Sequence, residues 1–254
     1  MYKHALAGLL AAVLAGLAVV ANAAPIVTVS ALGATDAQAA EQAFLSTLTS
    51  GYHTETFETY TSGAASQSGS LVTSVGTFTH DVAGFGGACD SGAFSCAGGT
   101  AVLDATQTPF SGRYALPTAV GNDNWLDSMD AQALTFTPLS GVNALGFYLT
   151  DANDAGGRLG IGGADFLLAD LLGGPLSNGS IFYITLFDIA GLGPISLYAN
   201  DASDGFGIDS VTVGTMPVSQ RASTPVPEPG TLTLLGLGLL GIGITRQRKA
   251  RLPH

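Results

Sequence analysis

The pattern that decides the fold is SIFYITLFD, residues Ser180 to Asp188. Successive side chains of a β-strand point to opposite faces of its sheet. One face of this stretch carries Phe182, Ile184 and Leu186, and the other carries Ile181, Tyr183 and Phe187. Both faces are therefore apolar, which predicts a strand inside a sheet that is covered on both sides.

Other short runs extend this pattern along the chain. They are rich in β-branched and aromatic residues and are separated by Gly, Asn, Asp and Ser, as strands and turns are. The runs are 53–60, 71–79, 100–105, 133–137, 144–150, 195–199 and 206–213. Many strands with little helix predict a mainly β protein, a β-sandwich or jelly roll, over residues 24–214.

One amphipathic helix is expected before the strands, at about residues 36–50. The segment TDAQ, residues 35–38, has the form of a capping box, and Gly51 stands where a C-terminal cap would. Apolar residues then recur every three or four positions, as on one helix face: Ala37, Ala40, Phe44 and Leu48. A second short helix is expected at 165–172.

The composition excludes several classes of protein. Hydrophobic residues make up 46% of the chain and charged residues 11%, which argues against a disordered polyelectrolyte. Residues 24–226 hold 18 acidic residues and only Arg113, Arg158 and Arg221 as basic ones, a net charge of −15. A body this acidic repels nucleic acid and anionic lipid, so nucleic-acid binding is not expected.

The first 23 residues have the pattern of a secretory signal peptide. Lys3 precedes an uncharged apolar run over residues 5–20, and small residues follow at Ala21 and Ala23. This order, with the A-x-A site, predicts cleavage after Ala23. A retained membrane anchor is the alternative.

The C-terminal residues show three segments in order. Residues 215–230 are rich in Pro, Ser and Thr and include Pro227, Glu228 and Pro229. Residues 231–245 are uncharged and apolar; as a helix they would be about 22 Å long, which spans a bilayer only marginally. Residues 246–254 form a basic tail, which predicts a cytoplasmic end, with positive charges at Arg246, Arg248, Lys249 and Arg251.

This tripartite arrangement resembles the PEP-CTERM sorting signal of exported proteins in Gram-negative bacteria that make exopolysaccharide. The resemblance implies recognition of Pro227, Glu228 and Pro229 by an exosortase, an integral-membrane enzyme that removes the tail. The implied partners are the exosortase, the secretion machinery, the inner membrane for a time, and exopolysaccharide. A plain tail anchor is the alternative to a processed signal.

The only cysteines, Cys89 and Cys96, lie in a glycine-rich segment. After export we expect them to form one disulfide that closes a short loop. No histidine lies close to them and no C-x-x-C is present, so a structural bridge is favoured over a metal or redox site.

Two segments, 143–151 and 204–214, carry a weaker resemblance to galactose-binding-like jelly rolls and carbohydrate-binding modules. That resemblance implies a structural Ca²⁺ held by Glu58 and Asp209, together with other oxygen ligands, since Ca²⁺ takes 6–8 of them. Trp125, the only tryptophan, has Asn and Asp neighbours and could stack against a sugar ring. The alternatives are acidic residues that make turns and a tryptophan in the core.

No catalytic motif stands out. The body contains only two histidines, His53 and His80, and lacks G-x-S-x-G and H-E-x-x-H. Its many carboxylates could form a glycosidase pair, but the sequence does not select one. We therefore expect a non-enzymatic structural or adhesive protein of the cell surface or exopolysaccharide matrix. A Ca²⁺-stabilised carbohydrate-binding module and a glycan hydrolase are the alternatives.

Overall fold

The strand predicted to be interior is paired on both edges in the computed structural model of the chain. This strand, β11 (Ile181–Phe187), pairs antiparallel with β8 (Ala144–Thr150) along its whole length and with β1 (Ile26–Val29) on the other side. Phe182, Ile184 and Leu186 lie in the main core, and Ile181, Tyr183 and Phe187 lie in a second cluster under a helix. The two apolar faces are confirmed.

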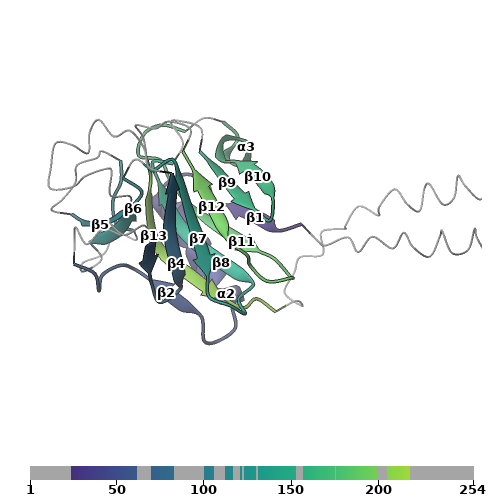
Figure 1. The fold of residues 1–254 in the computed structure, drawn as a ribbon. Coiled ribbons are helices and arrows are strands. Elements are labelled where there is room, and N and C mark those ends of the chain that lie inside the picture. Colours follow the sequence, from purple (N-terminus) through teal and green to yellow (C-terminus); the bar gives the residue numbers. More distant parts are fainter. Residues whose placement is uncertain are drawn as a thin grey trace, which may run out of the picture. The chain divides into compact units, whose positions relative to one another are not determined.

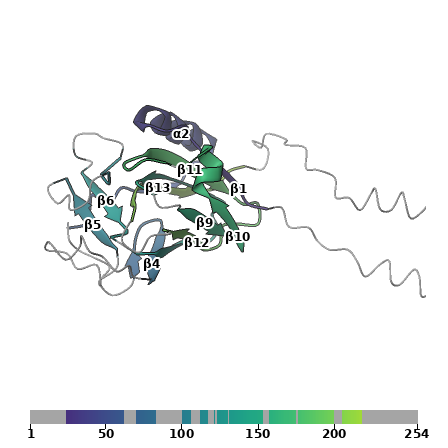
Figure 2. The same ribbon diagram turned by 90° about the horizontal axis from the view of Figure 1, so that it is seen from above.

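The described residues belong to a unit that ends at Pro217. The structure describes residues 24–61, 70–82, 100–105, 112–116, 121, 123–129, 131–152, 157–174, 176–199 and 205–217. Two antiparallel sheets face each other in this part of the chain, and a helix covers the outer face of one of them (Figures 1 and 2). The predicted mainly β sandwich is confirmed.

The first sheet contains β11 and has the strand order β1-β11-β8-β13-β6-β5, with β2 also paired to β13. The bounds of its remaining strands are β2 (His53–Glu55), β5 (Ala101–Asp104), β6 (Asn124–Asp127) and β13 (Gly207–Gly214). A bulge interrupts β13 between Asp209 and Thr212, where Ser210 has a φ of 47°. A bulge re-aims side chains, and here it turns Asp209 and Ser210 toward Leu116.

The second sheet has the strand order β10-β9-β12-β7-β4-β3. Its strands are β3 (Ser70–Val72), β4 (Gly76–Val82), β7 (Ala133–Pro138), β9 (Arg158–Ile161), β10 (Ala164–Leu167) and β12 (Ile195–Tyr198). The run predicted at 71–79 is split, because a turn at residues 73–75 separates β3 from β4. The Thr73 N–H donates to the Gly76 carbonyl across that turn.

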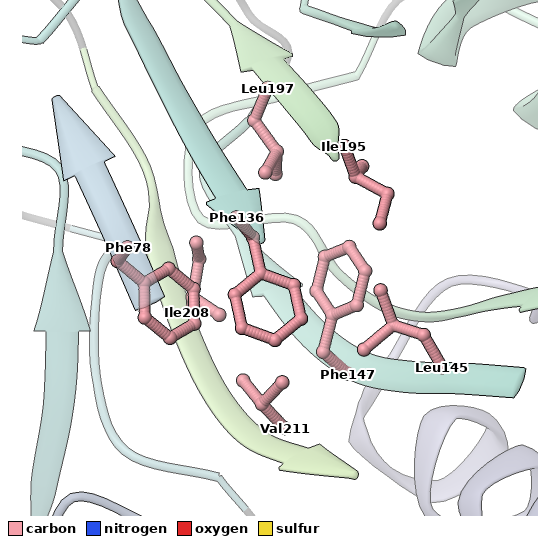
Figure 3. Close-up of a pocket in the computed structure, with 8 residues that line it drawn as sticks. All are labelled: Phe78, Phe136, Leu145, Phe147, Ile195, Leu197, Ile208 and Val211. Atoms are coloured by element: carbon pink, nitrogen blue, oxygen red, sulfur yellow. The ribbon is translucent and has the colours of Figure 1, made fainter. Parts of the chain in front are cut away.

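The main core fills the space between the sheets. The rings of Phe78 and Phe136 stack with their centroids 4.5 Å apart, and Figure 3 shows them beside Phe147, Ile208 and Val211. The space that these side chains leave is about 10 Å³ and is lined only by apolar atoms. An apolar space close to the minimum for one water stays dry, so it is a packing defect and not a ligand site.

The predicted helix is present but shifted, since α2 spans Ala34–Thr47 and not residues 36–50. Gly33 precedes it without a side-chain cap, so the capping box at 35–38 does not form. The helix ends before Leu48, because Thr49 turns away to donate its N–H to the Thr215 carbonyl. Ala37 and Phe44 are buried against β8 and β11, as the periodicity predicted.

Four strands were not recognised in the sequence, and the second predicted helix, at 165–172, is present only over its last five residues. Residues 164–167 form β10, a partner of β9, and only α3 (Leu168–Leu172) is helical. Gly162 and Gly163 both have positive φ and make the turn between these strands. β10 is an edge strand with mostly exposed residues, so its sequence has no apolar alternation. β1, β6 and β9 are four-residue strands, too short for a clear period.

The two ends of the described chain emerge at the same end of the first sheet. Ile26 pairs with Phe187, Phe187 with Ala144, and Ala144 with Gly214, so the four residues form one row across four neighbouring strands. Strands lie about 4.8 Å apart, which separates Ile26 from Gly214 by roughly 14 Å. The opposite end of the same strands carries Thr150 and Gly207. The chain therefore enters and leaves the sandwich at the same end, which we call the chain exit, and Thr150 and Gly207 mark the opposite end.

Candidate functional sites

An arginine is buried between two aspartates at the end of the sandwich opposite the chain exit. Arg113 Nη1 donates to Asp127 Oδ1 over 3.1 Å and to the Met129 carbonyl over 2.9 Å. Its Nε lies 3.4 Å from Asp151 Oδ2. All three charged side chains are almost inaccessible to solvent. These buried ion pairs hold three segments of the chain together, those that carry Arg113, Asp127 and Asp151.

Asp127 is the centre of this arrangement. It accepts hydrogen bonds from the Trp125 indole N–H, over 3.0 Å, and from the Met129 N–H, over 2.7 Å. Burial raises the pKa of the Asp127 carboxyl, and the nearby Arg113 charge opposes that rise. Asp151 in turn accepts the Gly179 N–H. These donors use the oxygens of both aspartates internally, so the network orders loops and offers no reactive group to solvent.

Trp125 lies in the core and not on the surface. Its side chain is 1% exposed and packs with Ala101, Leu103, Ala115 and Met129. Neither face of the indole is available to a sugar ring, so the sugar contact considered for Trp125 does not fit this structure. The alternative that placed this tryptophan in the core agrees with its position.

Glu58 and Asp209 come into the same region, since the Glu58 charge contributes to raising the pKa of the Asp209 carboxyl after the larger effect of burial. Asp209 is 1% exposed, and its two oxygens accept the Leu116 and Ser210 N–H groups, each over 2.5 Å. Glu58 accepts the Asn124 N–H. No group of three or more His, Cys, Asp or Glu side chains suited to a metal ion exists among the described residues. Both oxygens of Asp209 and one oxygen of Glu58 thus bond to backbone N–H groups, and the Ca²⁺ site at this pair stays a prediction.

A second buried polar network, not predicted from the sequence, lies under α2. The Tyr148 hydroxyl donates to Glu41 Oε2 over 2.7 Å, and the Tyr148 and Tyr183 rings meet edge to face. Burial raises the pKa values of Glu41, Tyr148 and Tyr183, and Glu41 adds to the rise for both tyrosines. The sequence did contain one signal for this network. Glu41 is the single glutamate of the helix, and it stands four residues after Ala37 on the same helix face.

Gly146 makes room for this network. A Cβ at Gly146 would overlap the Tyr183 hydroxyl and would lie 2.7 Å from two ring carbons of Phe44. The close approach of these side chains to the β8 backbone lets α2 lie directly on the sheet. The network therefore holds the helix in place, and its acidic groups are enclosed.

Two open hollows occur on the described surface. One, of about 280 Å³, lies between α2 and strands β1 and β11 and is lined by alanines, hydroxyl side chains and Met216. The other, of about 560 Å³, lies between residues 140–143 and 189–193 and is lined largely by glycine and small side chains. Neither lining contains an Asp, Glu, His, Lys or Arg side chain. Neither hollow therefore presents an acid–base pair for catalysis.

The chain exit is held by the side chain and backbone of Asn143. Asn143 Oδ1 accepts the Met216 N–H over 2.7 Å, and its Nδ2 donates to the Met216 carbonyl over 3.2 Å. The Asn143 N–H donates to the Gly214 carbonyl over 3.1 Å. The side-chain amide thus pairs with Met216 as a neighbouring strand would, and it continues the β13 ladder beyond Gly214.

Thr49 holds the same exit from the other side. Its backbone N–H donates to the Thr215 carbonyl over 2.9 Å, and its hydroxyl donates to the same oxygen over 3.1 Å. Asn143 precedes β8 and Thr49 follows α2, so two distant segments grip three consecutive residues. We call these contacts of Asn143 and Thr49 with residues 214–216 the exit clamp.

Several predicted site residues lie outside the described residues. They are the signal-cleavage residues Ala21 and Ala23, the cysteines Cys89 and Cys96, the motif Pro227, Glu228 and Pro229, and the basic residues Arg246, Arg248, Lys249 and Arg251. The predicted membrane span at 231–245 also lies outside. In the part of the chain that the structure does describe, no helix has the length and apolar character to cross a membrane.

Comparison with known proteins identifies the C-terminal segment. Residues 225–249 match the PEP-CTERM protein-sorting motif. No curated protein and no solved structure matches the chain. The match confirms the resemblance seen in the sequence and identifies an exported protein that an exosortase sorts and processes. It covers a tenth of the chain and assigns no activity to the β-sandwich.

Proposed function

We propose that this chain, which carries a PEP-CTERM sorting motif, is a non-enzymatic structural or adhesive protein. It would act at the cell surface or in the exopolysaccharide matrix of a Gram-negative bacterium. In this proposal residues 1–23 direct export and are removed. The membrane holds residues 231–245 until an exosortase cuts near Glu228. The processed β-sandwich then remains outside the cell.

The observation that carries the proposal is the motif match at residues 225–249. The interior of the sandwich supports a structural role, because its buried acidic and basic groups bond to one another or to the backbone. The net charge of −15 over residues 24–226 suits a soluble protein among hydrated polysaccharides. A disulfide between Cys89 and Cys96 belongs to the same proposal, since thiols oxidise after export.

Intact-mass analysis of the protein purified from its native host tests the proposal. The expected mass lacks residues 1–23 and the residues after a cut near Glu228, and it is lower by two hydrogens for the disulfide. A mature protein that retains residues 246–254 would overturn the sorting part of the proposal. Free thiols in the exported protein would overturn the bridge alone.

The structural or adhesive role needs a separate test. A glycan array probed with the processed protein, with and without added Ca²⁺, is expected to show no Ca²⁺-dependent binding of a defined sugar. Incubation with host polysaccharide is expected to release no new reducing ends. Saturable Ca²⁺-dependent binding would favour a carbohydrate-binding module, and turnover would favour a glycan hydrolase.

A further inference from the structure

We propose that the exit clamp sets the length of free chain between the folded body and Pro227-Glu228-Pro229, and so determines whether the exosortase can reach that motif. The inference rests on the proposed function, in which an enzyme embedded in the membrane cuts beside a folded domain. It assigns Asn143 and Thr49 a positioning role in processing, although neither residue belongs to the sorting motif.

The clamp fixes where the ordered chain stops. Without it, β13 would end at Gly214, its last residue paired to β8. Asn143 adds two hydrogen bonds to Met216, and Thr49 adds two to the Thr215 carbonyl. Bonds on both sides of the exit residues keep them from peeling away from the body.

The clamp is also tied to the rest of the sheet. The Asn143 carbonyl accepts the Asp188 N–H over 3.0 Å at the end of β11, while the Asn143 N–H bonds to Gly214. All hydrogen-bonding groups of this one residue therefore join the end of β11 to the exit of the chain. Met216 is therefore connected through Asn143 to two interior strands, β11 and β13.

The length of chain beyond the clamp gives the proposal its scale. Ten residues, 217–226, separate Met216 from Pro227. An extended chain spans at most about 3.3–3.6 Å per residue, so these residues reach no farther than about 35 Å. This distance is comparable with the size of a small domain, so the body and a membrane enzyme would compete for space if the free chain were shorter.

A deletion series in the native host tests this inference with the full-length chain. Single-residue steps remove one to seven residues from 218–224 and leave the motif at 225–249 intact. Each deletion is paired with a version in which Gly and Ser restore the original length. The processed fraction is measured by intact mass.

We expect processing to be lost beyond a threshold deletion and to return when Gly and Ser restore the length. Asn143→Ala combined with Thr49→Ala removes the side-chain bonds to Met216 and Thr215. This double variant should tolerate deletions one or two residues longer, a gain of up to about 7 Å of chain. Ser196→Ala, which removes a hydroxyl contact of 3.1 Å with Thr135 in the second sheet, should leave the threshold unchanged.

The outcomes separate this inference from the proposed function. An undeleted chain that is never processed would overturn the sorting proposal. Processing at every deletion length, or the same threshold with and without the clamp, would overturn the positioning role and leave sorting intact. Thr49→Ala alone, a milder change, should shift the threshold in the same direction if the double variant does not fold.

Discussion

The network around Arg113 and the network under α2 are both buried against the first sheet, and they handle negative charge in different ways. Arg113 places a positive charge between Asp127 and Asp151. Glu41 and Tyr148 under α2, and Asp209, the partner of Tyr148 in the sheet, are all acidic groups, and burial raises the pKa of each of them. The first network compensates its carboxylates with a cation, and the second compensates them with hydrogen bonds alone, although burial raises the pKa of Asp127 in the first network as well.

This difference explains how so acidic a body can fold with few basic residues. Residues 24–226 contain three arginines and no lysine. Arg113 is placed where two carboxylates are enclosed, while Asp209 depends on the backbone N–H groups of Leu116 and Ser210. The segment 112–116 links the two networks, because Arg113 belongs to one and Leu116 to the other. Substitutions in the two networks should therefore change the free energy of unfolding by different amounts and with a different dependence on pH.

The largest effect is expected from Arg113→Met. Methionine fills similar space but leaves Asp127 and Asp151 buried without their cation. Removing one partner of a buried ion pair costs about 3–5 kcal/mol of unfolding free energy, which urea denaturation measures. The control is Asp165→Asn, which breaks the Arg158–Asp165 pair of the same 3.1 Å length but with side chains 40% and 56% exposed. An exposed pair is worth about 0–1 kcal/mol, and similar losses in both variants would contradict the comparison.

A smaller loss is expected on the other side of the comparison, from Gly146→Ala. The new Cβ would meet the Tyr183 hydroxyl and the Phe44 ring. Overpacking of a filled site costs about 1–3 kcal/mol, and α2 should become more susceptible to proteolysis. Gly193→Ala is the matched control, because a Cβ at that position would meet no atom within 4 Å. An unchanged melting temperature for Gly146→Ala would show that α2 is not held as described.

The pH dependence of stability should identify the acidic network. Because the pKa of Glu41 is above its ordinary value of 4.5, the folded protein holds this proton more tightly than the unfolded chain does. The resulting stability is complete below about 4.5 and is lost as the pH rises through the raised folded pKa. Glu41→Gln keeps an acceptor for the Tyr148 hydroxyl but does not titrate.

The free energy of unfolding of Glu41→Gln should therefore fall less steeply than that of the unchanged protein as the pH rises above about 4.5. The decline should not vanish, because the pKa of Asp209 is raised as well. Gln42→Ala, at an exposed position of the same helix that does not titrate, should keep the original slope. If the free energy of unfolding depended on pH in the same way in Glu41→Gln and in the unchanged protein, Glu41 would not cause this pH dependence.

The smallest effect is expected for Trp125, whose fluorescence can be followed alone because the chain has one tryptophan. The buried indole should emit at short wavelength and resist quenching by acrylamide. Adding host polysaccharide should leave the spectrum unchanged, since neither ring face reaches solvent. A sugar-dependent shift in emission would show that the Arg113 side opens to ligands.

The strand pattern was predictable where strands are long and covered on both faces. Residues 144–150 and 181–187 matched the structure closely, because burial on both faces favours apolar residues at most of their positions. The edge strands β10 and β1 were not predictable, because few of their side chains are buried. The four residues of β6 are all buried, but two of them are Asn and Asp, so the strand has no apolar pattern in the sequence. The end of α2 was misplaced because Thr49 bonds to Thr215, which lies 166 residues further along the chain.

The candidate sites divide along the same lines. The sorting motif is linear and was recognised from Pro227, Glu228 and Pro229 with the segments that follow them. The Arg113 and Glu41 networks could not be recognised, because their members are distant in sequence and each residue type is ordinary by itself. The sugar contact at Trp125 failed for a related reason: Asn and Asp neighbours in sequence did not reveal that the strand is buried.

The sequence by itself determined the mainly β architecture and the sorting segment, because alternation and a tripartite motif are local properties of a chain. Only the tertiary structure decided which carboxylates are enclosed, which cation compensates them, and how Asn143 and Thr49 hold the exit. Those properties depend on contacts between residues far apart along the chain. Burial gives such contacts their energy, and burial exists only after the two sheets have packed together.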